Sequence, residues 1–594
     1  MDFRNRSTLW LLALVFILPL VIYLPSVTRD AFVSIDDSLL ITKNAAVQQL
    51  TPRTIGYVFT SYDPELYIPL TLFTYQMEFA IVGANPFLFH LTSLLLHCGS
   101  ALLLFFILKR MFKFELIAAF GALLFALHPL NTEAVAWASA LKDILSSFFF
   151  FGSLLLYLRW RDDGRSGIPW GSLVLFVLAL LSKVTVAMLP FVLLLMDWRD
   201  GELPTVRSLR EKLPYCGLSG LFIIIALFGK AKGIGELGLW KTGLLAAKSI
   251  LFYLQNFFFP LHLSVIYAQQ TPVTLTSPEF FIPVLGVLIL VALIITLHKQ
   301  WRDASFGLTF FLLMLLPNFA NFWKNRFIFF ASDRYTYIPM IGLIVILCSL
   351  CVFILSRREH QRRPISISLG AVITLLAVLT FLQTRPWATD ISLYSNVLRW
   401  YPDSALAQNN LGDAYYREKN QDLALQWFTK AVDQNPSYIQ AIDNAAGVYL
   451  ARGQYDQAQE WFQRGIAAIP TDPRPEDLAP RYRLGELLVN LGKTEEGLTQ
   501  FKAAAKALPD LAEPYFNWAL QLQKVGRNDE AIVLFEEAVS LDSYDIASRY
   551  HLAGLYAEKG RLGEARDQLK KIVAINPGYE KAAAHLADIE RLMQ

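Results

Sequence analysis

Several features that would mark common classes of soluble protein are scarce in this chain. It has four cysteines in 594 residues, and its single C-x-x-C pair, Cys348 and Cys351, has no second pair or histidine cluster at the spacing of zinc ligands. The formal net charge is only +3, without the basic stripe typical of nucleic-acid binding. We therefore expect no zinc site and no nucleic-acid partner, and we expect the cysteines in a core or facing lipid.

The composition indicates two different parts. Hydrophobic residues make up 54% of the chain, which is too much for a soluble protein of this size, yet 17% of the residues are charged, which is too many for membrane helices alone. The first apolar run, 8–27, is longer than the core of a signal peptide and lacks a following cleavage site of small residues. It is expected to be a retained membrane helix.

Further apolar runs up to 365–383 predict about 11–13 membrane crossings. Basic residues lie in alternate connections, which the positive-inside rule assigns to the cytoplasm. These connections are 109–113, 159–165, 199–212, 298–302 and 357–363. The alternation holds only if the run at 243–260 re-enters the membrane or lies flat on it.

The remaining connections are expected to face outward, and they carry ionisable residues next to apolar helices. The long loop 28–87 contains the adjacent carboxylates Asp36 and Asp37. Ionisable side chains at membrane depth usually face a polar cavity, because contact with lipid is costly. His97 could point into the same chamber, or could simply bond a neighbouring helix. The other outward-facing residues are His128, Glu133, Lys142, Asp143, Lys183, Lys324, Arg326, Asp333 and Arg334.

From residue 405 the chain repeats at a period of 34, the length of a tetratricopeptide repeat (TPR). The small and aromatic positions recur in phase: Leu411, Gly412, Tyr415, Ala424 and Phe428 are followed 34 residues later by Ala445, Ala446, Tyr449, Ala458 and Phe462. The predicted fold is all-α, with a polytopic membrane domain at 1–390, a linker at 391–404, and five repeats with a capping helix at 405–594.

The repeats should form a curved solenoid on the outer side, since the last membrane run begins at a basic cluster. Polar residues near the start of the first helix of a repeat suit hydrogen bonds to an extended peptide. Ordinary solvation of a helix face is the alternative for them. The candidate acceptor-binding residues are Asn410, Asp413, Asn444 and Asn517.

The order of several motifs resembles one family. The chain reads "SIDDSLLITKN", "HPLNTEAVAW", "LSKVTVAMLP" and "SDRYTYIPMIG" before its repeats. It is similar to the transmembrane-and-TPR O-mannosyltransferases and their bacterial relatives, within the class of polytopic glycosyltransferases with the C-type fold. It departs from that family after Lys183, where Val184 replaces the usual acidic residue, and before Asp143, where Lys142 stands in place of the common Arg.

The resemblance implies transfer of a sugar from a polyprenyl-phosphate carrier to an acceptor hydroxyl, usually with inversion. One of Asp36 and Asp37 would be the base, and the other would orient the acceptor or raise its partner's pKa. Solvation or helix capping is the alternative for this pair. The residues expected to bind the donor phosphate or sugar are Lys142, Asp143, Lys183, Arg334, Tyr335 and Tyr337, and those expected to line the cavity are His97, His128 and Glu133.

Other interpretations stay open. Arg334 could be an interfacial anchor, and the two tyrosines part of an aromatic belt. The chain could also be a membrane-anchored TPR scaffold, a transferase that modifies envelope lipid or polysaccharide, or a transporter. The expected partners are a lipid-linked hexose and a protein or peptide acceptor, in a bacterial inner membrane with the repeats in the periplasm. The residues identify neither the sugar nor a metal requirement, because two carboxylates underdetermine an ion site.

Overall fold

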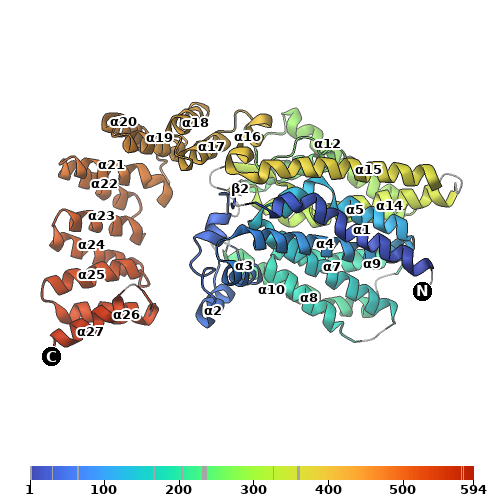
Figure 1. Cartoon of the computed structure of the whole chain (residues 1–594), viewed down its shortest axis with the longest axis horizontal. Coiled ribbons are helices and arrows are strands. Elements are labelled where there is room, and N and C mark those ends of the chain that lie inside the picture. Colours follow the sequence, from blue (N-terminus) through green and yellow to red (C-terminus); the bar gives the residue numbers. More distant parts are fainter. Residues whose placement is uncertain are drawn as a thin grey trace. The chain divides into compact units, whose positions relative to one another are not determined.

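The computed structural model describes residues 3–29, 31–62, 66–164, 167–202, 205–229, 237–324, 327–357, 362–576, 578–579 and 581–594. The chain divides into two compact units, Met1–Pro402 and Asp403–Gln594. Both units are built from helices, which confirms the predicted all-α class (Figure 1).

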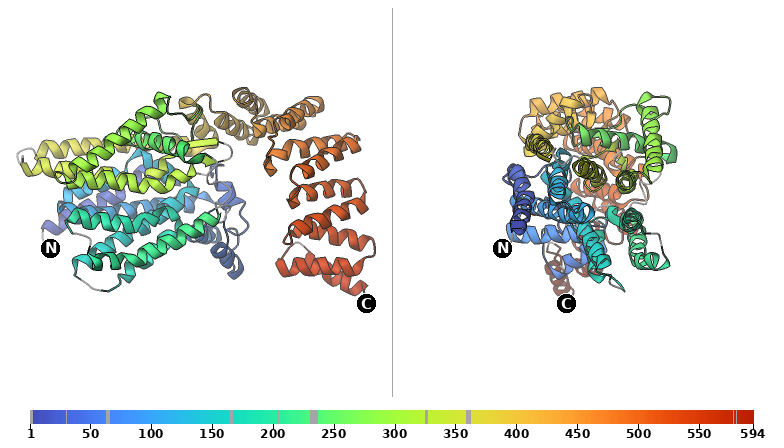
Figure 2. Two further views of the ribbon diagram at one scale, coloured as in Figure 1. Left: turned by 180° about the vertical axis from the view of Figure 1, so that it is seen from behind. Right: turned by 90° about the vertical axis from the view of Figure 1, so that its right-hand side faces the viewer.

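The first unit is a bundle of helices that run roughly parallel to one another, and one view looks along several of them (Figure 2). Its N-terminus and α9 lie at one end, whereas α2, α3 and β2 lie at the other (Figure 1). We call these the inner and outer ends. The helices are α1 Phe3–Val27, α2 Pro52–Thr60, α3 Pro69–Val82, α4 Pro86–Phe112, α5 Glu115–Ala126, α6 Thr132–Ala136, α7 Leu141–Asp162, α8 Trp170–Ser182, α9 Leu189–Asp200, α10 Val206–Gly229, α11 Gly238–Phe258, α12 Pro278–Leu297, α13 Arg302–Leu315, α14 Met340–Arg357, α15 Arg362–Thr384 and α16 Asp390–Trp400.

By length and apolar composition, eight helical segments among the described residues could cross a membrane, or nine if the bent pair 115–126 and 129–136 counts as one span. The sequence analysis expected 11–13. The difference comes from short helices: α8 and α9 have 13 and 12 residues and are separated by the 3-10 turn Val184–Met188. An α-helix rises about 1.5 Å per residue, so neither can span about 30 Å alone.

Close helix packing in this unit depends on glycine. Gly307 of α13 and Gly342 of α14 face each other so closely that a Cβ on either one would strike the other's carbonyl oxygen. Small residues are the usual solution in membranes, because apolar side chains gain little by leaving apolar lipid and backbones must approach to gain dispersion energy.

A small antiparallel sheet at the outer end orders the strands β1 (Tyr267–Ala268), β3 (Phe327–Ala331) and β2 (Trp323–Lys324) as β1-β3-β2. Strand β3 leads directly into the 3-10 turn Asp333–Thr336. The sheet therefore fixes the position from which Ser332 and Arg334 project.

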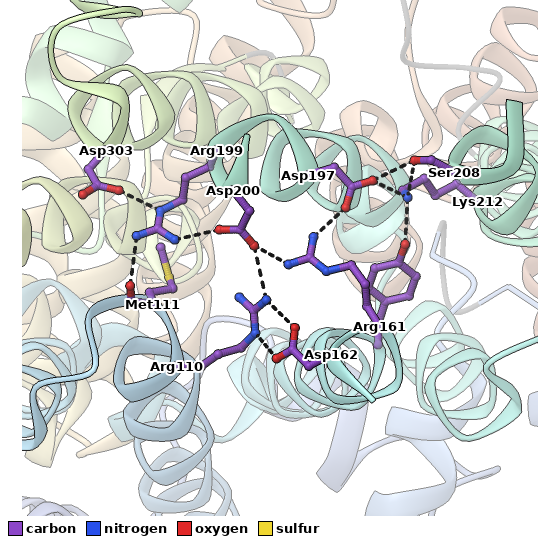
Figure 3. A network of polar contacts seen from close by, with 11 residues as sticks. Arg110, Met111, Arg161, Asp162, Asp197, Arg199, Asp200, Ser208, Lys212 and Asp303 are labelled. Carbon is purple, nitrogen blue, oxygen red and sulfur yellow. Dashed lines mark hydrogen bonds and ion pairs between the residues drawn. The ribbon is translucent and has the colours of Figure 1, made fainter. Parts of the chain in front are cut away.

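The inner end is held by a network of ion pairs (Figure 3). Asp200 accepts from Arg110 at 3.2 Å and from Arg199 at 3.0 Å, and it also pairs with Arg161. Arg161 reaches Asp197 at 2.7 Å. These basic residues were predicted to share one side of the membrane, and the structure brings them together. The network's remaining ion-paired members are Asp162, Lys212 and Asp303.

The second unit contains five antiparallel helix pairs and a final helix, as the repeat period predicts. Gly412 lies against Phe428, and Gly485 against Phe501; a Cβ on either glycine would be 2.7 or 2.5 Å from the ring. The small position therefore lets the two helices of a repeat meet. The helices are α17 Ala405–Arg417, α18 Gln421–Gln434, α19 Ile439–Ala451, α20 Tyr455–Ala467, α21 Ala479–Asn490, α22 Thr494–Ala507, α23 Ala512–Lys524, α24 Asn528–Leu541, α25 Ile546–Glu558, α26 Leu562–Ile575 and α27 Ala582–Leu592.

The segment 391–404, expected as a linker, is mostly helix α16. Thr389 caps this helix and forms a reciprocal capping box with Ser392. Leu393, Tyr394 and Val397 are buried. The first unit therefore extends past the predicted boundary at 390.

Candidate active site

The double-Asp segment follows α1 at the outer end, and the two carboxylates have different surroundings. Asp37 is fully buried. Its Oδ1 accepts from the backbone N–H of Ser139 at 2.9 Å and from the Ser139 hydroxyl at 2.5 Å, while Oδ2 accepts from the Val33 N–H at 3.2 Å. Asp37 thus ties its own loop to the turn before α7.

Asp36 is only half-buried. Its carboxylate interacts electrostatically with Lys142, Arg334 and Tyr335, which come from two distant parts of the sequence. A short π-helical turn, Ser38–Thr42, follows the pair, and such turns are frequent at functional sites. Of the two adjacent carboxylates, Asp36 is therefore the one whose charge acts on both Lys142 and Arg334.

Arg334 is anchored by Glu133 of α6. The guanidinium Nη1 pairs with Glu133 Oε1, and the Arg334 backbone N–H donates to Oε2 at 3.1 Å. The Ser332 hydroxyl donates to Glu133 Oε1 at 2.7 Å. Because Glu133 is almost completely buried, its charge requires these donors. The pair fixes the guanidinium beside the double-Asp loop.

Lys183 and Asp143 form a second buried pair, with Nζ and Oδ1 2.5 Å apart. The other oxygen, Asp143 Oδ2, has no hydrogen-bond partner among the described residues, and neither has Arg334 Nε. These two atoms lie 3.9 Å apart. A buried cation and a buried carboxylate therefore approach each other here without completing a hydrogen bond.

Aromatic rings support the three cations. Arg334 lies 4.8 Å from the ring centroid of Trp137 and 5.0 Å from that of Tyr335. Lys183 lies 5.5 Å from Tyr335, and Lys142 lies 5.6 Å from Trp137. Cation–π contacts stabilise charge without using the N–H donors. Each cation also donates to protein oxygens: Lys142 to the Ser139 carbonyl at 2.7 Å, Lys183 to Asp143, and Arg334 to Glu133 and Ser332. Only their remaining N–H donors can therefore serve an anion.

Burial shifts the protonation equilibria at this end. It raises the pKa of Asp37 to about 7, although three donors oppose the shift. Burial also lowers the pKa of Lys183, against the opposing effect of Asp143. Burial and the nearby Glu133 raise the pKa of Asp333 well above its usual range, and its Oδ1 accepts from the Tyr267 hydroxyl at 2.8 Å. Such perturbed groups cluster at functional sites.

Three predicted site residues lie apart from the charged cluster. His97 and Tyr337 bond each other at 2.7 Å, and His97 Nε2 lies 2.9 Å from the Ala126 carbonyl oxygen. His128 stacks on Phe257 and reaches its carbonyl oxygen at 2.9 Å. These contacts join separate segments of the bundle, and within the part of the chain that the structure describes they lead to α5 and α11 and not to the double-Asp loop. Arg326 and the Lys324 side chain lie outside the described residues.

The predicted acceptor-binding residues lie on first helices of their repeats. The Asn444 amide donates to Asn409 Oδ1 at 3.0 Å, and Asn409 donates to Asn410 Oδ1 at 3.3 Å. Asp413 pairs with Arg417 one turn away, at 3.0 Å. Asn517 is half-buried on α23. Buried Asn409 therefore orients Asn410 and Asn444, a role the sequence analysis did not assign.

Sequence reasoning also missed Trp137, Ser139 and Ser332. Trp137 stands in the H-P-x-x-x-E-x-V-A-W motif, and Ser332 precedes D-R-Y, so both lay inside segments already singled out. Ser139 gave no signal, since its role depends on a fold contact with Asp37. Among the described residues, no group of three or more His, Cys, Asp or Glu side chains is placed to hold a metal ion.

Comparison with known proteins assigns a class to each half. Residues 64–228 match a family described as dolichyl-phosphate-mannose-protein mannosyltransferase. The matched segment includes Lys142, Asp143 and Lys183. Residues 391–439, 416–478 and 522–589 match TPR families. The chain thus joins a segment similar to membrane mannosyltransferases to TPRs, and its apolar helices identify it as a multi-pass membrane protein.

The chain is similar to several proteins named protein O-mannosyl-transferase, among them TMTC1 and TMTC3. It is 23% identical to TMTC3 of Homo sapiens over 87% of this chain and 62% of the relative. It is 39% identical to human TMTC1 over 21% of this chain and 14% of that protein. The chain thus spans about three fifths of the length of TMTC3. Among solved structures, the chain is similar to YrrB, described as a TPR protein with an unusual peptide-binding site. The alignment covers 33% of this chain and 97% of YrrB, at 22% identity and a TM-score of 0.25.

Proposed function

We propose that this protein is a membrane O-mannosyltransferase that moves a mannosyl group from a polyprenyl-phosphate carrier to a Ser or Thr hydroxyl of a protein. The observation that carries the proposal is the different surroundings of the two carboxylates. Asp37 accepts hydrogen bonds from two backbone N–H groups and the Ser139 hydroxyl. Asp36 is half-buried and interacts with Lys142 and Arg334. A base is needed beside cations in this reaction.

In the proposed reaction, the acceptor oxygen attacks the anomeric carbon of the donor. The new C–O bond forms as the bond from that carbon to the phosphate oxygen breaks, which inverts the configuration. Asp36 takes the hydroxyl proton, and polyprenyl phosphate leaves with the bonding electron pair. Lys142, Lys183 and Arg334 stabilise the negative charge that develops on the phosphate.

Asp37 acts here as the residue that holds Asp36 in position. Asp143 and Glu133 orient Lys183 and Arg334, and the ring of Tyr335 lies beneath both cations. We further propose that the outer end and the repeats face the non-cytoplasmic side, the periplasm in a bacterium, because the inner end carries the Arg-rich connections.

The test is transfer from radiolabelled polyprenyl-phosphate-mannose to a Ser/Thr peptide by purified full-length protein in lipid. Asp36→Asn should lower turnover by about 10²–10⁴, the usual contribution of a general base, and should still bind donor. Asp37→Asn is the matched control: one oxygen still accepts from Ser139, so the loss should be smaller. Unchanged turnover in Asp36→Asn would refute the assignment. A donor that binds but is never cleaved would favour a transporter or scaffold.

The repeats are proposed to bind the acceptor through Asn410 and Asn444, whose amide orientations are set by Asn409. A side-chain amide can pair with both the N–H and the C=O of an extended peptide. Asn410→Ala and Asn444→Ala should each raise the acceptor KM severalfold, as loss of a hydrogen bond worth about 1 kcal/mol implies. The donor KM should not change. Gln434→Ala, at an exposed amide on α18, is the control. An acceptor KM unaffected by either Asn variant would assign the repeats another role.

A further inference from the structure

The double-Asp loop is braced by a segment about 350 residues away in the sequence. This brace, residues 384–393, comprises the end of α15, the 3-10 turn Arg385–Ala388 and the start of α16. It lies within the same compact unit as the loop. Three independent kinds of contact join the two: carbonyl capping, a backbone-to-carboxylate bond and a buried apolar cluster.

Carbonyl capping is done by Arg29, at the start of the loop. Its Nη2 donates to the Thr384 carbonyl at 2.6 Å, and its Nη1 donates to the Trp387 carbonyl at 2.8 Å and lies 3.4 Å from that of Ala136. Thr384 ends α15 and Ala136 ends α6. The last carbonyls of a helix lack helical partners, and a cation there also interacts favourably with the helix dipole. Arg29 thus fastens two helix ends to the loop.

Two successive amides of the loop each have a carboxylate acceptor. The Val33 N–H donates to Asp37, within the loop, whereas the Ser34 N–H donates to Asp390 Oδ1 at 2.8 Å. Asp390 is the first residue of α16. The backbone just before Asp36 is therefore held from both sides, by Asp37 and by the brace.

The apolar contact continues from the brace to the cations. Val33, Trp137, Trp387 and Leu393 are buried in one cluster, with Ile35 packed against it. The rings of Trp387 and Trp137 stack, with centroids 6.1 Å apart and planes 28° apart. Arg334 lies over Trp137. The brace thus supports both sides of the candidate site, the loop that carries Asp36 and the ring beneath Arg334.

We propose that Arg29, Trp387 and Asp390 are positioning residues that hold Asp36 in its reactive placement. The expected change in kcat rests on the mannosyltransferase function proposed above. The expected change in hydrogen exchange of the loop does not. Their contacts described above act through the backbone of 33–35 and through Trp137. A misplacement of about 1 Å in a reacting group can cost about a hundredfold in rate.

The experiment compares Asp390→Ala with Asp390→Asn in the full-length protein. Asparagine lacks the charge but keeps an oxygen that can accept from Ser34, whereas alanine removes the acceptor. Asp403→Ala is the control, because Asp403 is an exposed carboxylate shortly after α16. Hydrogen exchange of a peptide covering 31–41 measures loop placement without any need for activity, and kcat, donor affinity and acceptor KM are measured in parallel.

Asp390→Ala should raise exchange in 31–41 by about tenfold, consistent with one lost buried hydrogen bond. It should lower kcat by about tenfold to a hundredfold with donor affinity unchanged. Asp390→Asn and Asp403→Ala should resemble the wild type. If asparagine behaves like alanine, the charge at the start of α16 matters rather than the bond to Ser34, and the assignment of Asp390 fails.

Trp387→Leu tests the apolar contact separately, since leucine still fills part of the cluster and the protein's yield and melting temperature report whether it folds. It should raise exchange in 31–41 and lower kcat in the same direction as Asp390→Ala. Wild-type exchange in both variants would overturn the brace. If the wild-type protein itself shows no transferase activity but exchange still rises in the variants, the brace stands and the proposed function is refuted.

Discussion

The two ends of the membrane unit both concentrate opposite charges, but they arrange them differently. In the inner network each carboxylate pairs with one or more cations, and Asp200 by itself pairs with three arginines (Figure 3). At the outer end, Asp143 Oδ2 and Arg334 Nε are buried without a hydrogen bond among the described residues, 3.9 Å apart. We call the inner network a clamp, because its charged groups are paired with one another and join helix ends. The outer end, in contrast, has buried polar atoms that make no hydrogen bond among the described residues.

That difference separates structural charges from charges available to a ligand. Saturated pairs stabilise one arrangement, because removing either partner leaves a buried charge behind. Groups held by aromatic faces and by single contacts keep N–H donors for an incoming anion. Both ends are rich in basic residues, so composition alone would not distinguish them.

Among the tests of this comparison between the two ends, the largest effect is expected at the Lys183–Asp143 pair. Lys183→Met should lower turnover by about 10²–10³, because the leaving phosphate loses a preorganised cation. It should also destabilise the protein, because Asp143 is left buried without its partner. The measurements are turnover and melting temperature in detergent.

The double variant Lys183→Met with Asp143→Asn sharpens this test. It should recover most of the lost stability, since no unpaired charge remains, but not the turnover. If turnover returns with stability, the outer pair is a structural clamp like the inner network, and the comparison between the two ends fails.

The inner clamp should show the reverse pattern. Asp197→Asn removes the charge that Arg161 and Lys212 share, which should lower the free energy of unfolding by about 3–5 kcal/mol, as for a broken buried pair. Turnover of the folded protein at a permissive temperature should stay within about twofold of the wild type. A large fall in turnover without loss of stability would contradict the clamp.

A smaller effect is expected in the pH dependence of stability. Burial raises the pKa of Asp37 from 3.8 to about 7 in the folded protein, so the folded state holds this proton more tightly than the unfolded chain does. Its contribution to stability is therefore complete below about pH 3.8 and is lost as pH rises towards 7. The difference in melting temperature between wild type and Asp37→Asn, followed from pH 4 to 8, should change in that window. A constant difference would show that Asp37 is not protonated there.

The smallest effect is expected at the exposed rim of the inner network. Asp162 pairs with Arg110 at 2.6 Å, but its side chain is 45% exposed. Asp162→Asn should change the free energy of unfolding by less than about 1 kcal/mol, because water screens exposed pairs. Denaturation in the same detergent, beside Asp197→Asn, measures the contrast between rim and centre.

The prediction of the repeats from the sequence was confirmed, whereas the roles assigned to the site residues stay predictions. A 34-residue period fixes helix pairs because each repeat contacts mainly its neighbours. The outer cluster was located because ionisable residues are rare at membrane depth. His97, His128 and Tyr337 shared that signal, yet His97 bonds Tyr337 and the Ala126 carbonyl, and His128 bonds the Phe257 carbonyl. Charge and polarity indicate which side chains avoid lipid, but they do not distinguish a ligand site from a helix contact.

The sequence by itself determined the all-α class, the division into an apolar and a repeat half, and the segments from which the site is drawn. These follow from local composition, period and motif. Only the tertiary structure decided which carboxylate of the pair acts on the cations, which residues saturate the inner clamp, and that residues 384–393 brace the double-Asp loop. The first and the last of these depend on atoms that approach from more than a hundred residues away, such as Ser139 to Asp37 and Asp390 to Ser34. Contacts of that kind leave no period or pattern in a single sequence, because either partner alone is an ordinary polar residue.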